Sequence, residues 1–206
     1  MGTIVSVQNK GTSISLGIRP DIPDFSVVPG GSVAVDGACL TVEEIRGAVI
    51  YFAAVKETLD RTTLSSAVSG RRVNCERAME VKGRFDGHIV LGHVDGVGII
   101  ERDQDLGGSI MRTFRIPDNL VKFMPQKGSV AIDGISLTIA SAEFNKISVS
   151  LIPATMEKTT MLKKKKQDVV NLECDVLARY LKRLLDSSAQ QSSGEALLAK
   201  MERLGF

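Results

Sequence analysis

The sequence predicts an all-β protein that contains one small barrel twice and ends in a helix. Residues 31–42 (GSVAVDGACLTV) recur as residues 128–139 (GSVAIDGISLTI), with eight of the twelve positions identical. Short apolar runs with a period of two, separated by glycine turns, are typical of strands in small barrels. A helical apolar stripe occurs only near the C-terminus. Together these observations indicate a duplicated β module followed by one helix.

The repeat extends well beyond its central motif. The offset of 97 residues between the two copies also aligns VNxE at 73–76 with 170–173, and PD at 20–21 with 117–118. It aligns three threonines, Thr58, Thr62 and Thr63, with Thr155, Thr159 and Thr160. A unit this long exceeds the short repeats of solenoids. We therefore expect two similar domains, residues 1–87 and 88–174, and a C-terminal helix and tail over 175–206.

Within the first copy, strands are expected over residues 2–18 (one or two strands), 33–35, 40–42 and 49–55, because apolar residues alternate there. Residues 57–64 are rich in threonine and have no helical apolar stripe. Residues 73–76 close the copy, and the second copy repeats the pattern.

The helix is expected to begin near Asp175, a good N-cap residue. Its apolar stripe consists of Leu177, Tyr180, Leu181, Leu184 and Leu185. The stripe could pack on its own barrel or form a seam with another copy. A polar linker is expected over 187–193, and a capping box at Ser192 and Glu195 then predicts a short helix that ends near Gly205.

Composition excludes several classes of protein. The chain has 206 residues, 43% of them hydrophobic, and a net charge of only +2, without the basic face that nucleic-acid binding requires. The lysine run at 163–166 has no counterpart in the first copy, so we interpret it as a solvated loop. The three cysteines have no CxxC spacing, which indicates a reducing compartment and no structural zinc site. No leader or membrane span is expected, and the predicted location is the cytoplasm.

Duplication suggests a function. Two copies of one concave module could bind two like molecules and hold them together for reaction. The alternative is a duplicated scaffold in which one pocket, or neither, is used. Cys39 of the first copy becomes Ser136 in the second, so a side chain that can act as a nucleophile stays in both. A lone cysteine, however, is more often a small buried apolar residue.

Both histidines lie in the glycine-rich segment 83–96. If this segment is an extended strand, His88 and His93 point to opposite faces because they are five residues apart, so they share no metal and at most one faces a site. His93 is the better candidate for proton transfer, since Gly92 next to it allows a ligand to approach closely. A purely structural histidine remains the alternative.

The motifs together resemble one family. GACLTV at 37–42, KETL at 56–59 with RTTL at 61–64, VNCERA at 73–78, GHIVLGHVDG at 87–96, KGSVAIDGISLT at 127–138 and LIPATMEKTT at 151–160 are similar in type and order to riboflavin synthase of the alpha-chain type. The resemblance covers about residues 2–186.

This resemblance implies two six-stranded Greek-key β-barrels, a C-terminal helix at the axis of a homotrimer, and active sites between the first barrel of one subunit and the second barrel of another. It implies that two molecules of 6,7-dimethyl-8-ribityllumazine disproportionate to riboflavin and 5-amino-6-ribitylaminouracil, without a metal or redox cofactor. It also suggests lumazine synthase as a partner protein.

Carried onto this sequence, the resemblance makes His93, Cys39, Ser136 and Ser32 the candidate catalytic residues. The expected ligand contacts of the first barrel are Cys39, Leu40, Thr41, Ala53, Ala54, Val55, Lys56, Glu57, Thr58, Gly92, His93 and Val94. Those of the second barrel are Lys127, Ser136, Leu137, Thr138, Ser150, Leu151, Ile152, Pro153, Ala154 and Thr155.

One departure from the family concerns the start. The family opens with MFTGI, so about eight residues of a first strand are expected to be missing before Gly2, and their counterpart in the second copy is expected to be a strand at 92–96. The rival to an enzyme is therefore a protein of the same fold that binds a lumazine or flavin without converting it.

Overall fold

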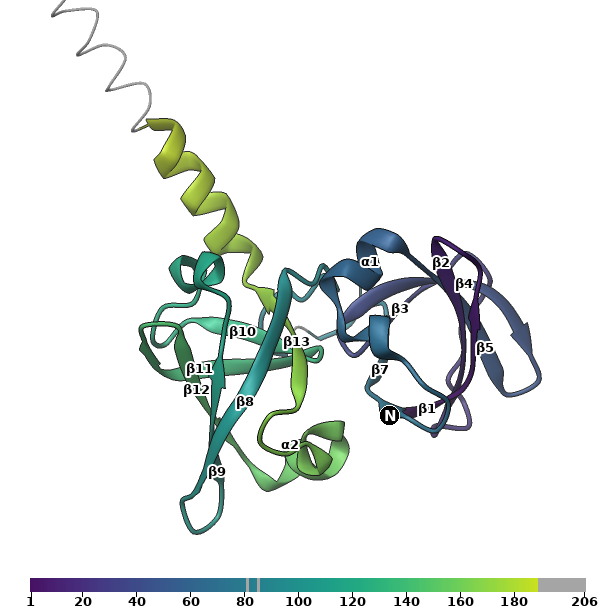
Figure 1. Ribbon diagram of the computed structural model, residues 1–206, viewed down its shortest axis with the longest axis horizontal. Helices are drawn as coiled ribbons and strands as arrows, with labels where there is room; N and C mark the ends of the chain where they lie inside the picture. The colour runs from purple at the N-terminus through teal and green to yellow at the C-terminus, as the bar shows by residue number, and fades with distance from the viewer. Residues whose placement is uncertain (81, 85, 189–206) are drawn as a thin grey trace, which may run out of the picture. The chain divides into compact units, whose positions relative to one another are not determined.

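The computed structural model describes residues 1–80, 82–84 and 86–188. Residues 1–175 form one compact unit and the residues from 176 on form another. The expected all-β architecture is confirmed, with two barrels of six strands each and a C-terminal helix. Figure 1 shows the strands of each copy curling around a core of their own.

The first copy comprises β1 (Gly2–Asn9), β2 (Ser13–Pro20), β3 (Ser32–Val35), β4 (Ala38–Arg46), β5 (Val49–Val55), α1 (Lys56–Arg61), η1 (Thr63–Ser66), β6 (Arg72–Val73) and β7 (Cys75–Arg77). Its strands are ordered β6-β1-β2-β5-β4-β3-β7. Because β6 and β7 are two parts of one segment separated only by Asn74, that segment pairs with both ends of the sheet and nearly closes the barrel.

The second copy comprises β8 (Gly96–Asp105), β9 (Ile110–Arg115), η2 (Asp118–Phe123), β10 (Ser129–Ile132), β11 (Ile135–Glu143), β12 (Lys146–Leu151), α2 (Pro153–Lys158), η3 (Thr160–Lys163) and β13 (Val169–Cys174). These strands form a closed barrel in the order β10-β11-β12-β9-β8-β13. Here β13 is continuous and pairs with both β10 and β8.

The strand ladders revise the alignment of the two copies at their start. Ile4 pairs with Ile18 just before a bulge, and Ile100 pairs with Phe114 just before the corresponding bulge. All four side chains lie in the cores. The first two strands of each copy therefore align with an offset of 96 residues, one less than the 97 expected from the sequence. A one-residue error matters because it would exchange the buried and exposed faces of a strand.

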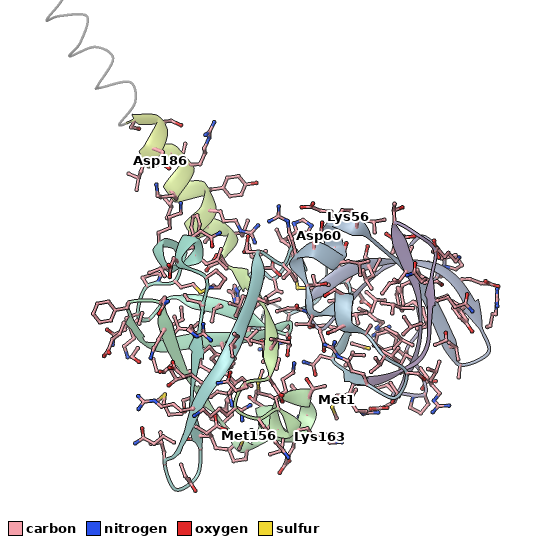
Figure 2. The ribbon with its side chains drawn as sticks, viewed as in Figure 1. Met1, Lys56, Asp60, Met156, Lys163 and Asp186 are labelled. Atoms are coloured by element: carbon pink, nitrogen blue, oxygen red, sulfur yellow. The ribbon has the colours of Figure 1, made fainter. Side chains whose placement is uncertain are left out.

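Two further expectations about local structure are wrong. No helix was expected in residues 57–64, but 56–61 form α1, in which Lys56 and Asp60, labelled in Figure 2, make an ion pair. Residues 92–96 were expected to be the strand that the second copy keeps, but 92–95 are irregular and β8 begins only at Gly96. Neither segment has the alternating apolar pattern of a half-buried strand.

The two barrels meet through a pair of equivalent hairpin turns. Asp36-Gly37 joins β3 to β4 and Asp133-Gly134 joins β10 to β11, and all four residues have positive φ, as two-residue hairpins of type I′ require. A Cβ atom on Gly37 would lie 2.5 Å from the nitrogen of Gly134. Only glycine therefore allows the turns to pack this closely.

Two equivalent asparagines bind the turns together. The Nδ2 of Asn171 donates to the carbonyl of Asp36 at 2.7 Å, and its Oδ1 accepts from the N–H of Thr63 at 2.7 Å. Asn74 makes the matching bonds to the carbonyl of Asp133 at 3.0 Å and to the N–H of Thr160 at 2.9 Å. The aligned VNxE motifs thus supply the polar contacts between the barrels.

Charged groups are buried at the same interface. Arg71 lies 2.9 Å from a carboxylate oxygen of Asp36, and Lys164 lies 2.9 Å from Oδ2 of Asp133. Burial, with the charge of Asp133 nearby, raises the pKa of Asp36 to about 7. Lys164 belongs to the lysine run that we expected to be a solvated loop. For this residue the expectation is wrong, because a buried carboxylate attracts one of the four ammonium groups out of solvent.

The helix of the second unit covers residues 176–188 and begins directly after Asp175, as expected. Residues 187–188, expected to open a polar linker, are still helical. The rest of that linker and the predicted short helix lie outside the described residues. None of the helices described is long and apolar enough to cross a membrane.

Candidate functional site

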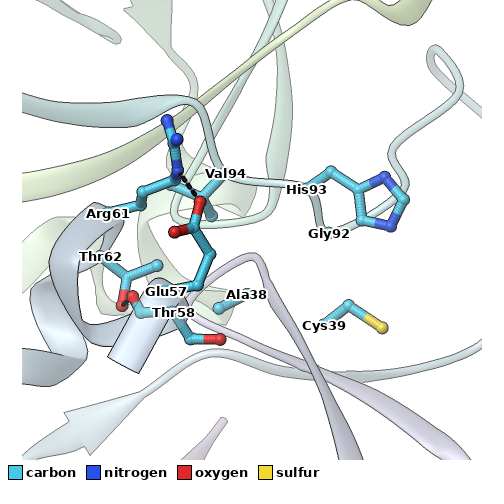
Figure 3. Close-up of a pocket in the computed structure, with 9 residues that line it drawn as sticks. All are labelled: Ala38, Cys39, Glu57, Thr58, Arg61, Thr62, Gly92, His93 and Val94. Atoms are coloured by element: carbon cyan, nitrogen blue, oxygen red, sulfur yellow. Dashed lines mark hydrogen bonds and ion pairs between the residues drawn. The ribbon is translucent and has the colours of Figure 1, made fainter. Parts of the chain in front are cut away.

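A cavity of about 210 Å³ lies beside the first barrel (Figure 3). Its walls come from the start of β4, from α1 and from the segment that joins the two copies. Six of the lining residues are among the expected ligand contacts: Cys39, Glu57, Thr58, Gly92, His93 and Val94. Ala38, Arg61 and Thr62 also line it and were not expected. None of the expected second-barrel contacts lines this cavity.

Close backbone packing places His93 at the cavity. The N–H of Cys39 donates to the carbonyl of Gly92 at 2.8 Å. Gly92 has a φ of +76°, and a Cβ atom there would lie 2.7 Å from the Cβ of Cys39. Glycine is therefore required at this position, and the following histidine is held at the same end of the cavity as the thiol (Figure 3).

A buried carboxylate of the second barrel fixes this segment. Glu173 on β13 accepts the N–H of Leu91 at 2.8 Å and that of Gly92 at 2.9 Å. Only 2% of Glu173 is exposed. Its carboxylate tolerates this burial because each of its two oxygens accepts one of these hydrogen bonds. Sequence reasoning did not select Glu173 as a functional residue. The only sequence signal was its alignment with Glu76 in the repeated motif.

Ser136, at the aligned position of the second barrel, also contacts a Gly-His pair, but through its side chain. The Nδ1 of His88 lies 2.7 Å from the Oγ of Ser136, and the backbone N–H of His88 also donates to this oxygen at 3.3 Å. Gly87 has a φ of +109°, and a Cβ atom on it would lie 2.6 Å from the same oxygen. One Gly-His pair thus contacts Cys39 in the first copy, and the other contacts Ser136 in the second.

Sequence reasoning expected at most one histidine to face a site, whereas the structure places His93 at the cavity and His88 against Ser136. The expectation assumed a regular strand, but residues 86–95 are irregular and contain two glycines with positive φ. Burial lowers the pKa of His88, although the charges of Asp175 and Glu173 oppose the shift. A neutral imidazole hydrogen-bonded to a hydroxyl can exchange a proton with it, which is the geometry of general base catalysis.

The remaining expected residues fall into three groups. Ser32 pairs with Thr41 in the β3–β4 ladder, and the side chains of both are exposed, as is that of Cys39. Ser136 and Thr138 are likewise exposed on β11. By contrast, three expected contacts have side chains buried in the cores, so that only their backbone could meet a ligand: Leu40, Ala54 and Leu151.

The other expected contacts are exposed or partly exposed. Lys127 is exposed and has a φ of +68°, a conformation that the first copy assigns to Gly30 with a φ of +82°. Lys56 pairs with Asp60 across α1. Leu137 on β11 is partly exposed. The residues around the β5–α1 and β12–α2 junctions are partly or fully exposed: Ala53, Val55, Ser150, Ile152, Pro153, Ala154 and Thr155.

Comparison with known proteins agrees with the duplicated barrel. The family model described as "Lumazine binding domain" matches residues 1–78 and again residues 91–175. The structure is similar to that of LumP complexed with riboflavin, with a TM-score of 0.78, 24% identity and coverage of 84% of this chain and 94% of that chain. At this level of identity the likeness shows the fold.

Curated relatives carry one name. The chain is 35% identical to riboflavin synthase of Bacillus subtilis over 97% of this chain and 94% of that protein. It is 36% identical to riboflavin synthase of Photobacterium phosphoreum over 100% and 95% of the two chains. For riboflavin synthase of Chlamydia muridarum the identity is 41% over 84% and 85%. The chain therefore belongs to the lumazine-binding domain family and, within it, to the riboflavin synthases.

Proposed function

We propose that this protein converts two molecules of 6,7-dimethyl-8-ribityllumazine into one riboflavin and one 5-amino-6-ribitylaminouracil. One molecule passes a four-carbon unit to the other, and the atoms of the two products equal those of the two substrates. The observation that carries the proposal is the pair of equivalent sites. Each combines a side chain that can act as a nucleophile, Cys39 or Ser136, with a histidine supplied by the segment between the copies.

Proton transfer is the step for which the second site is best arranged. A four-carbon transfer of this kind requires protons to move to and from carbon. His88, with its lowered pKa, is largely neutral near pH 7 and can accept a proton directly or through the hydroxyl of Ser136. His93 lines the first pocket together with Cys39, and we propose that it serves the second reactant in the same way. Cys39 and Ser136 are proposed to add transiently to the lumazine ring.

Reaction between two bound lumazines requires the two kinds of pocket to face each other. We propose that this occurs between subunits of a homotrimer, where the first barrel of one subunit meets the second barrel of the next. Support comes from helix 176–188, whose large apolar and aromatic side chains are between 59% and 68% exposed in the single chain: Leu177, Tyr180, Leu181, Leu184 and Leu185. Such a stripe favours association with other helices.

Three finer proposals accompany this function. We place the domain boundaries at 1–87, 88–174 and 175–206. The cytoplasm is the proposed location, and the three free cysteines are compatible with a reducing compartment. Lumazine synthase is proposed as a partner, because the lumazine that it produces is the substrate of the proposed reaction.

A second candidate function is binding without conversion. It is favoured by the structural likeness to LumP, of which complexes with flavin mononucleotide, riboflavin and the lumazine are known. One experiment separates the two functions. Purified protein is incubated with 6,7-dimethyl-8-ribityllumazine, and lumazine and riboflavin are quantified by chromatography. An enzyme yields one riboflavin for every two lumazines consumed, whereas tight binding without riboflavin after long incubation supports the carrier.

A further inference from the structure

One end of the cavity of the first barrel carries an ion pair that the second barrel does not repeat at the aligned positions. Glu57 and Arg61, one turn apart on α1, both line the cavity and form an ion pair with each other (Figure 3). The aligned positions on α2 are Ala154 and Lys158. The pair therefore belongs to the first site and is not part of the shared barrel scaffold.

The two ends of the cavity differ in chemistry. Cys39 and His93 lie together at one end, and Glu57 with Arg61 lies at the other (Figure 3). If the reacting ring lies against Cys39 and His93, as the proposed function requires, its ribityl chain extends toward the ion pair. The charge at this end thus meets the terminal hydroxyl of the ligand, which is also the position that carries the phosphate in ribityl phosphates.

The electrostatics of this end oppose a phosphate. An unpaired arginine is a good phosphate ligand because its guanidinium forms two parallel hydrogen bonds with phosphate oxygens. Arg61 instead donates from Nε to a carboxylate oxygen of Glu57, and the negative charges of Asp95 and Asp60 also act on it. A dianionic group that approached Arg61 would therefore compete with Glu57 for the guanidinium and would meet the negative charges of Asp95 and Asp60.

We propose that Glu57 makes the first pocket selective for ribityl ligands with a free terminal hydroxyl and against their 5′-phosphates, by occupying Arg61. Neutral ribityl hydroxyls can hydrogen-bond to either member of the pair, whereas a phosphate competes with Glu57 for Arg61. The proposal rests on the proposed function for the orientation of the ligand. It assigns to Glu57 a role in specificity and not in the chemical step.

The test uses equilibrium binding of two flavins to the full-length protein. Riboflavin and flavin mononucleotide are titrated separately by quenching of flavin fluorescence, with the wild type and with Glu57→Gln. The wild type is expected to bind riboflavin more tightly. Glu57→Gln should raise the affinity for flavin mononucleotide about tenfold, since Arg61 becomes free for a charge-assisted pair, while riboflavin affinity changes less than about twofold. This gain should shrink at high salt.

Two controls make the result specific. The double variant Glu57→Gln/Arg61→Gln should lose the gain, because the cation that binds the phosphate is gone. Glu157→Gln on α2 removes one negative charge from the equivalent helix and should leave the affinity ratio of the two flavins unchanged.

Several outcomes would overturn the proposal. These are equal affinity of the wild type for both flavins, an unchanged ratio in Glu57→Gln, the same shift in Glu157→Gln, or no measurable binding of riboflavin by the wild type. The readout is independent of turnover. A protein that never converts lumazine but shows the expected ratios would refute the proposed catalysis and leave this specificity intact.

Discussion

Replacing Asn171 with alanine should destabilise the protein strongly, although Asn171 is not among the residues that line the candidate cavity. Asn171 is 1% exposed and lies where the two barrels meet. Its side chain accepts from the N–H of Thr63 and donates to the carbonyl of Asp36, both at 2.7 Å. Alanine removes both bonds and leaves these two buried backbone groups without their partner.

The magnitude follows from these contacts. Leaving one buried polar group unsatisfied costs about 1–3 kcal/mol, so two groups predict a loss of about 2–6 kcal/mol in the free energy of unfolding. Water that enters the space of the deleted side chain would move the value to the lower end. Since a domain is stabilised by only about 5–15 kcal/mol, the loss should be obvious.

Urea unfolding followed by circular dichroism measures the change. Asn145→Ala is the matched control, because the hydrogen bond of its side chain to Asp118, at 3.1 Å, is exposed to solvent. The control should change stability by less than about 0.5 kcal/mol. Asn74→Ala should fall between the two, since Asn74 makes the equivalent bonds but is only half-buried. A loss below about 1 kcal/mol for Asn171→Ala would refute the reasoning that these bonds hold the barrels together.

Three further predictions follow from the structure. His88→Gln should lower kcat by roughly 10²–10⁴-fold with little change in lumazine affinity. Adding Ser136→Ala to this variant should lower kcat little further, because the two side chains act as a unit. Additive effects of the two changes in steady-state kinetics would contradict this. Burial raises the pKa of Asp36 to about 7, above an unfolded value of about 3.9, so between these pH values the folded state holds a proton that the unfolded state has lost. The stability of the wild type relative to Asp36→Asn should therefore fall as pH rises from 5 to 8, by at most about 1.4 kcal/mol per pH unit. A pH-independent difference in urea unfolding would show that Asp36 does not titrate in this range. Truncation after Asp175 should give monomers with little activity in sedimentation and turnover assays, and an active monomer would exclude the proposed inter-subunit site.

Much of the fold could be predicted because duplication is directly visible in the sequence. The recurrence of residues 31–42 at 128–139 predicted two similar barrels, and the Asp-Gly pairs within it form equivalent turns. The helical stripe predicted the C-terminal helix, which the structure describes to residue 188. Local periodicity failed at residues 56–61, where the helix is only six residues long and buries none of them. So short an element has no room for an apolar stripe.

The candidate site could be predicted only in part. The resemblance selected six of the nine residues that line the cavity. It did not select Arg61, whose importance depends on its contact with Glu57, or Glu173, whose carboxylate binds backbone 81 and 82 residues away along the chain. Such contacts leave no periodic signal in the sequence.

By itself the sequence determined the repeated module, its turns and the placement of Cys39 and Ser136 at equivalent positions, because these depend on local pattern and on comparison of the chain with itself. Only the tertiary structure decided that His88 meets Ser136 while His93 lines one cavity with Cys39, and that Lys164 leaves solvent for Asp133. The physical reason is that glycines with positive φ make the path of residues 86–95 irregular. The path of such a segment depends on groups that are distant in sequence and come together only when both barrels pack. The same is true of the pairing between a buried carboxylate and a cation.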